Sequence, residues 1–177
     1  MPDYLAVGSN DDLCRMPMTP HTAKRIAELF GASLTTTKMV DIIYRNAELK
    51  LRPLPLTVTD SVRIHPATFL AHSGLITSQR VSAGKPLGTL IAGTKKDVVI
   101  THRLTERPGS VFIYGWHRLN GKPIQPLYGG HSAAYVDYSH GIRLVDTRVK
   151  VDDVWMDLRA LLADPVLFAL LADEPIP

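Results

Sequence analysis

The stretch Tyr114-Gly115-Trp116-His117-Arg118-Leu119-Asn120-Gly121-Lys122-Pro123-Ile124-Gln125 carries the clearest folding signal in the chain. Asn-Gly readily adopts the positive φ angles of a tight turn, and apolar and aromatic residues flank it on both sides. The stretch therefore predicts an antiparallel hairpin within a strand-rich second half. Gly- and Pro-bounded runs predict further strands at residues 88–92, 97–101, 133–138 and 142–145.

The first half predicts helices. Thr19-Pro20 is a typical helix start, with Thr as N-cap and Pro at the first helical position, and Gly31 marks the end of that helix. A second helix is expected at 36–49, a third opens at Pro66 and is weakened at Gly74, and two short helices are expected at 155–162 and 165–171. The predicted fold is α+β: a helical N-terminal half packed on a mainly antiparallel sheet, closed by two short C-terminal helices.

Size and composition describe an ordinary globular protein. The 177 residues fit one domain spanning 1–177, with 45% hydrophobic and 21% charged residues. No apolar run approaches the roughly 18 residues that span a bilayer. The net charge is +3 and the basic residues are scattered, which disfavours nucleic-acid binding and leaves only a faint preference for anionic partners such as cell-envelope polymers.

The single cysteine, Cys14, excludes an intrachain disulfide and a cysteine-based zinc site. A buried, inert thiol is favoured for it over a nucleophile activated by Arg15. The first residues, Met1-Pro2-Asp3-Tyr4, lack a basic segment followed by an apolar run, so no signal peptide is predicted. A cytoplasmic protein and a processed secreted form are both compatible with these features, and the oligomeric state is not determined.

Polar and aromatic side chains concentrate between residues 116 and 141. His131, Asp137 and His140 fall within ten residues, and two imidazoles with a carboxylate are a common ligand set for a divalent metal such as zinc. The spacing matches no specific zinc signature. Histidines that serve only structural hydrogen bonds are the alternative, and His140 before Gly141 could simply tie a bend to the backbone.

The same segment allows a metal-free interpretation. Ser139 is a possible nucleophile, with His117 or His131 as its base and Asp137 as the group that orients the base. His140 is adjacent to Ser139 and would point to the opposite face of a strand. The pattern also departs from a nucleophile elbow, because Asp137 stands where glycine is needed and a strand follows.

Aromatic residues suggest a recognition surface in the same region. Trp116, Gln125 and Tyr138 are the candidate substrate-binding residues, because rings supply flat contact area and polar groups fix orientation. A sheet with one solvent-exposed face is the simpler explanation of this pattern. Lys95-Lys96-Asp97 is interpreted as an ordinary strand entry rather than as an anion clamp.

Together with Pro17-Met18-Thr19-Pro20, four phrases resemble a group of uncharacterised bacterial proteins: Lys95-Lys96-Asp97-Val98-Val99, Tyr114-Gly115-Trp116-His117, Pro123-Ile124-Gln125-Pro126-Leu127 and Tyr135-Val136-Asp137-Tyr138-Ser139-His140-Gly141. The similarity extends from about residue 4 to residue 150. It implies a bacterial origin and an undivided domain, and no activity or catalytic residue is attached to the group.

Together these observations favour a bacterial hydrolase that acts on cell-envelope peptide or glycan, or on a small ester or amide. His131, Asp137 and His140 would bind a metal or share acid–base work, with His117 and Ser139 close by. The alternative is a non-catalytic carbohydrate- or protein-binding module that uses the aromatic sheet surface. A catalytic role requires that the imidazoles of His117, His131 and His140 and the Asp137 carboxylate converge on one pocket.

Overall fold

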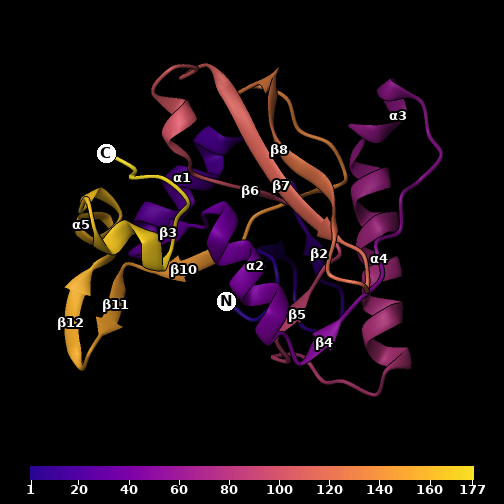
Figure 1. Cartoon of the computed structure of the whole chain (residues 1–177). Coiled ribbons are helices and arrows are strands. Elements are labelled where there is room, and N and C mark those ends of the chain that lie inside the picture. Colours follow the sequence, from indigo (N-terminus) through magenta and orange to yellow (C-terminus); the bar gives the residue numbers. More distant parts are fainter.

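The computed structural model describes residues 1–177, and its centre is a four-stranded sheet (Figure 1). The strand order is β8-β7-β6-β9, and the hairpin of β7 and β8 is its longest part. β6 and β9 run parallel and the other two pairs are antiparallel, so the sheet is mainly antiparallel as predicted. The strands are β6 (Lys96–Val98), β7 (Ser110–His117), β8 (Pro123–Ser132) and β9 (His140–Gly141).

Four two-stranded pairs surround this sheet: β1 with β2, β3 with β10, β4 with β5, and β11 with β12. The β4–β5 pair is parallel and the other three are antiparallel. Their bounds are β1 (Ala6–Val7), β2 (Cys14–Arg15), β3 (Ala32–Leu34), β4 (Leu49–Lys50), β5 (Ile91–Ala92), β10 (Leu144–Asp146), β11 (Arg148–Val151) and β12 (Val154–Asp157).

Helices cover both faces of the central sheet. The α-helices are α1 (Pro20–Leu29), α2 (Thr37–Asn46), α3 (Asp60–Arg63), α4 (Pro66–Ser82) and α5 (Leu158–Ala163), and the 3₁₀ helices are His102–Leu104 and Leu167–Leu170. On one face, α1 packs its alanines against Val111 and Ile113, and α4 contributes Phe69 to a cluster with Trp116. On the other face, α2 packs Val40 against Phe112.

A bulge in β7 decides which face its last residues reach. The pairing with β8 is irregular between Val111 and Gly115, and Gly115 and Trp116 have φ values of 110° and 56°. Strict alternation from Val111 would place Trp116 on the α2 face. Because the bulge shifts the alternation, Trp116 lies against α4 and His117 lies against α2.

Several predicted elements are confirmed, and others are wrong. Thr19 caps α1 through a hydrogen bond from the Thr22 N–H, and the Asn-Gly turn joins β7 to β8. α4 runs through Gly74 without a break. The N-terminal half also contains the short strands β1–β4, of which β1 lies within the strand expected at residues 4–7. Residues 133–138 form a turn-rich connection instead of a strand, and 155–157 belong to β12 because they pair with β11.

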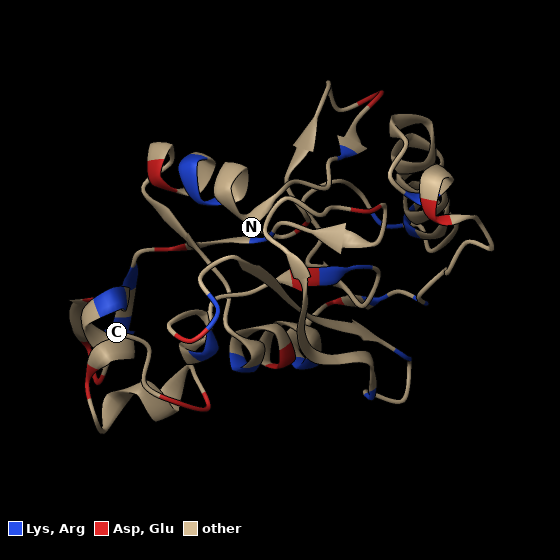
Figure 2. Cartoon of the chain, turned by 90° about the horizontal axis from the view of Figure 1, so that it is seen from above, with Lys and Arg blue, Asp and Glu red and all other residues tan.

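Charged side chains are interspersed over the elements (Figure 2), and five charged residues are buried in the interior: Arg15, Lys95, Asp97, Asp137 and Arg143. Arg15 forms a bidentate pair with Asp3, and Arg143 lies near Asp97 and over the Tyr4 ring. The carboxylate of Asp97 also accepts a hydrogen bond from the Tyr4 hydroxyl. None of the helices has the length and apolar character needed to cross a membrane.

Candidate active site

The connection between β8 and β9 is organised by the carboxylate of Asp137. One of its oxygens accepts the Ser139 N–H and the Ser139 hydroxyl, at 2.7 and 2.5 Å, and the other accepts the Tyr135 hydroxyl at 3.0 Å. Aspartate favours this local bonding because its short side chain reaches the backbone two residues on. These bonds bend the chain between His131 and His140 and hold Tyr135 in place.

Four rings form a continuous row from the surface into the interior. Tyr128 contacts His131 edge-on at 5.3 Å between ring centroids, His131 stacks on Tyr135 at 4.1 Å, and Tyr135 meets His140 edge-on at 5.7 Å. Tyr128, at one end, is 43% exposed, whereas His140 at the other end is 1% exposed. The structure therefore brings the two predicted histidines to the same cluster, with Tyr135 between them.

His140 is a buried imidazole whose two ring nitrogens have no hydrogen-bond partner. Burial lowers its pKa to about 4, and the positive charges of Lys96 and Lys95 act in the same direction. Gly141 follows it because the Tyr4 ring and the Lys95 side chain approach within 2.7 Å of the place where a Cβ would lie. At neutral pH, His140 is thus a neutral imidazole whose N–H and ring lone pair are both without hydrogen-bond partners.

Asp137 is the anionic member of the cluster. Burial opposes its ionisation, but His140, the hydrogen bonds from Ser139 and the charge of Lys96 together lower its pKa below the usual value. Burial, and after it the charge of the same carboxylate, raises the pKa of Tyr135. The cluster therefore combines a neutral imidazole, an ionised carboxylate and a protonated phenol at neutral pH.

Lysines from β6 and the residue before it complete the cluster. Lys96 is the parallel-strand partner of His140, and its ammonium lies 5.2 Å from the centre of the Trp116 ring. Burial lowers the pKa of Lys96, and burial followed by the charge of Arg15 lowers that of Lys95 to about 7. The Lys95 amine donates to the Tyr138 carbonyl at 2.6 Å. The sequence interpretation of Lys95 and Lys96 as an ordinary strand entry did not place them beside His140. Two adjacent lysines were the only sequence feature that could have indicated such a place.

Ser139 has no base in this arrangement. Its hydroxyl donates to Asp137, and its neighbours in the cluster place no imidazole nitrogen within hydrogen-bond distance of it. Ser139 therefore lacks the hydrogen-bonded imidazole that a serine nucleophile needs, and its two hydrogen bonds go to Asp137. Its burial follows from the turn in which it lies, between Asp137 and the start of β9.

His117 lies outside the cluster, which corrects its predicted role. Its Nε2 is 2.9 Å from an Asp41 oxygen, and its ring stacks on Tyr44 at 4.5 Å. Both partners belong to α2, on the face of the sheet opposite to α4. The β7 bulge is the physical reason, because it turns Trp116 toward the His140 side and His117 away from it.

The side chains do not fit the predicted zinc site. No group of three His, Cys, Asp or Glu side chains in the chain is arranged to hold a metal ion. Both Asp137 oxygens are engaged by hydroxyls or N–H groups, and the Tyr135 ring stands between the imidazoles of His131 and His140. We therefore derive no chemistry through a metal bound by these three residues.

The predicted aromatic platform is also corrected. Trp116 and Tyr138 are buried against Phe69 and Cys14, which leaves the Trp116 indole N–H without a partner. The Gln125 side chain, on β8, donates to the Pro126 carbonyl. Within the ring row, Tyr128 is exposed, and His131 and Tyr135 are partly exposed. Cys14 is a buried thiol, as predicted.

Comparison of the chain with protein-family models, with curated proteins and with solved structures finds no match.

Proposed function

We propose that the protein is a hydrolase whose general acid–base residue is His140. The observation that carries this proposal is a neutral, buried imidazole with both nitrogens free, placed beside an ionised carboxylate and two lysines at the inner end of a ring row. Buried polar groups are normally hydrogen-bonded, and those left without partners at a cluster of titratable residues are candidates for contact with a ligand or water.

In this proposal, His140 accepts a proton from a water molecule whose oxygen attacks the carbonyl carbon of an ester or amide. The negative charge that develops on the carbonyl oxygen is stabilised by the Lys96 ammonium. The imidazolium of His140, stabilised by Asp137, then returns its proton to the leaving alcohol or amine as the bond to carbon breaks. No covalent intermediate on Ser139 is required.

The row of Tyr128, His131 and Tyr135 provides the binding surface for the substrate in this mechanism. Rings that are partly exposed and carry hydroxyl or imidazole groups suit peptide or sugar units, which have both apolar faces and polar edges. The substrates that follow are a peptide or glycan of the cell envelope, or a small ester or amide.

The decisive comparison is His140→Gln against His117→Gln. Both histidines are buried, but only the first lies in the cluster. We expect His140→Gln to lower kcat/KM by about 100-fold or more, as for loss of a general base, while His117→Gln stays within about threefold of wild type. The rates are measured on 4-nitrophenyl esters and on purified peptidoglycan, with thermal unfolding as the check of folding.

The pH profile gives a second readout. Because burial places the pKa of His140 at about 4, kcat/KM should rise as the pH increases through about 4 and stay level toward neutrality. Equal activity of both glutamine variants, or wild-type protein inactive on all these substrates, contradicts the proposal.

A second candidate function is non-catalytic binding of a glycan or peptide, favoured by the exposure of Tyr128 next to the stacked His131–Tyr135 pair. In that case, the wild-type protein binds the glycan or peptide but does not hydrolyse it. Tyr128→Ala would then weaken binding by about 1–3 kcal/mol, and His140→Gln would leave it unchanged.

A further inference from the structure

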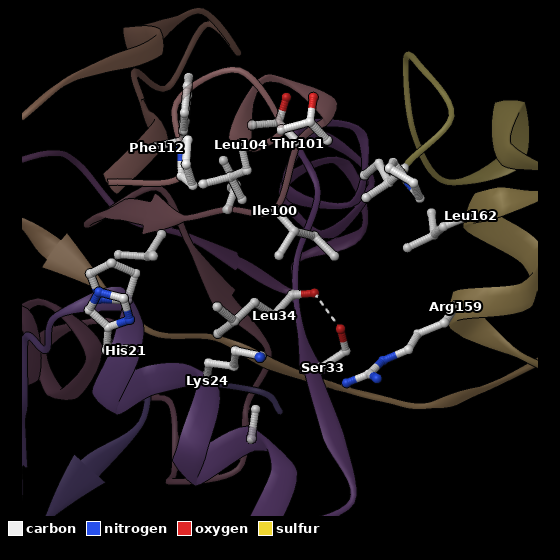
Figure 3. Close-up of a pocket in the computed structure, with 18 of the residues that line it drawn as sticks. His21, Lys24, Ser33, Leu34, Ile100, Thr101, Leu104, Phe112, Arg159 and Leu162 are labelled. Carbon is white, nitrogen blue, oxygen red and sulfur yellow. Dashed lines mark hydrogen bonds between the residues drawn. The ribbon is translucent and has the colours of Figure 1, made fainter. Parts of the chain in front are cut away.

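A cavity of about 820 Å³ lies away from the His140 cluster, between α1, β3, the end of β6 and the C-terminal segment with α5 (Figure 3). None of the residues of the ring row, nor Asp137, lines it. Its volume falls within the roughly 300–1,000 Å³ that is usual for small-molecule sites. A cavity of this size with no assigned role is the strongest unexplained feature of the molecule.

The inner walls are aliphatic and belong to the core. Leu34, Val98 and Leu162 are each buried and line the cavity from β3, β6 and α5. Figure 3 shows Leu34, Ile100 and Leu162 around the cavity, with Phe112 to one side. Because these side chains are held by three separate elements of the fold, the walls are preformed. Such a surface selects a hydrocarbon body and penalises a polar one, which would lose its bonds to water.

The rim is basic. Lys24 and Arg159 share a single carboxylate, that of Glu28, with the Lys24 ammonium at 3.5 Å and the Arg159 guanidinium at 4.0 Å from the same oxygen. Figure 3 shows the ends of both cationic side chains on the same side of the cavity, on either side of Ser33. Lys24 and Arg159 thus place two cationic side chains against one carboxylate, and the His21 imidazole lines another part of the cavity.

We propose that this cavity binds an aliphatic carboxylate, with the hydrocarbon chain against Leu34, Val98 and Leu162 and the carboxylate at Lys24 and Arg159. The apolar walls and the basic rim are complementary to the two ends of such a molecule. Lysine and arginine at an exposed rim pair readily with a carboxylate, and arginine does so through two parallel hydrogen bonds. This site is independent of the proposed hydrolase, because the two share no residue.

Calorimetric titration with decanoate, below its micelle concentration and at neutral pH, tests the site. We expect saturable binding at one site. Decanol, which lacks the charge, and decyltrimethylammonium, which reverses it, should bind at least about tenfold more weakly. His140→Gln should bind decanoate as the wild type does, which separates this site from the hydrolase.

Two kinds of variant locate the ligand. Ala160→Trp places a large side chain into the cavity from the exposed side of α5 and should abolish binding. Lys24→Met should weaken binding by about five- to tenfold, whereas Arg25→Gln, which removes a charge from the same helix but does not line the cavity, should leave it unchanged.

The proposal is overturned by absence of saturable decanoate binding to wild-type protein, by equal affinity for the cationic amphiphile, or by equal loss in Lys24→Met and Arg25→Gln. Retention of full affinity in Ala160→Trp overturns it as well. If Ala160→Trp does not fold, the pair of exposed charge variants decides the question, because neither side chain contributes to the core.

Discussion

Ser139 donates both its backbone N–H and its hydroxyl to one oxygen of Asp137, and this pair of bonds holds the chain where it enters β9. The carboxylate is thereby aligned beside His140 without touching its ring nitrogens. A single residue thus links the local turn to the electrostatics of the cluster, since the bonds that close the turn also stabilise the ionised form of Asp137.

Ser139→Ala separates a positioning role from a nucleophilic one. Loss of a hydrogen bond to a charged group should reduce the free energy of unfolding by about 1.5–3 kcal/mol. Activity should fall by no more than about tenfold, whereas removal of a serine nucleophile costs on the order of 10⁶-fold. Denaturant unfolding and ester hydrolysis give the two values, and Ser132→Ala, at an exposed position on β8, is the matched control.

At the scale of elements, the hairpin of β7 and β8 is both the strongest local signal and the place where simple alternation fails. The Asn-Gly turn is a property of two adjacent residues and could be predicted. The bulge at Gly115-Trp116 could not, because it depends on how β7 fits between β6 and β8 and on the packing of Trp116 against α4. A bulky residue at positive φ is held there by such surroundings.

Gly115→Ala tests the importance of the bulge. At φ 110° an alanine is strained, and its Cβ would lie 3.3 Å from the Val40 side chain on α2. We expect a loss of about 1–3 kcal/mol in the free energy of unfolding, measured with urea. Gly109→Ala, at a position with no atom within 4 Å of the added Cβ, should change stability by less than about 0.5 kcal/mol. An equal effect of both substitutions would mean that the strained backbone is not what Gly115 provides.

At the scale of the whole molecule, burial of titratable side chains couples stability to pH. Burial lowers the pKa of His140 to about 4 and that of His72 to about 3, while it raises that of Asp97 to about 6. The histidines contribute stability that is present above pH 6.5 and is lost as the pH falls through their folded pKa values. Asp97 acts in the opposite direction, because the folded state binds its proton more tightly than the unfolded chain does.

His140→Gln isolates one of these contributions. Acidification from pH 6.5 to about 4 should destabilise the wild type more than the variant, by up to about 3 kcal/mol. In this pH range the imidazole of the unfolded chain binds a proton, whereas the buried imidazole of the folded protein stays neutral, so acid favours the unfolded state. Urea unfolding of both proteins across this pH range gives the difference. A constant difference between them would show that the His140 pKa is not depressed by folding.

By itself, the sequence determined the features that depend on neighbouring residues: the helix starts at Thr19 and Thr36, the Asn-Gly turn, the α+β class and the concentration of polar groups between His131 and Gly141. The tertiary structure alone decided that Lys96 joins His140, that His117 turns to the opposite face, and that Trp116 and Tyr138 are buried. It also created the cavity between α1 and α5. These outcomes depend on strand pairing, the β7 bulge and helix packing between residues far apart in the chain, and such long-range contacts leave no regular pattern in the local sequence.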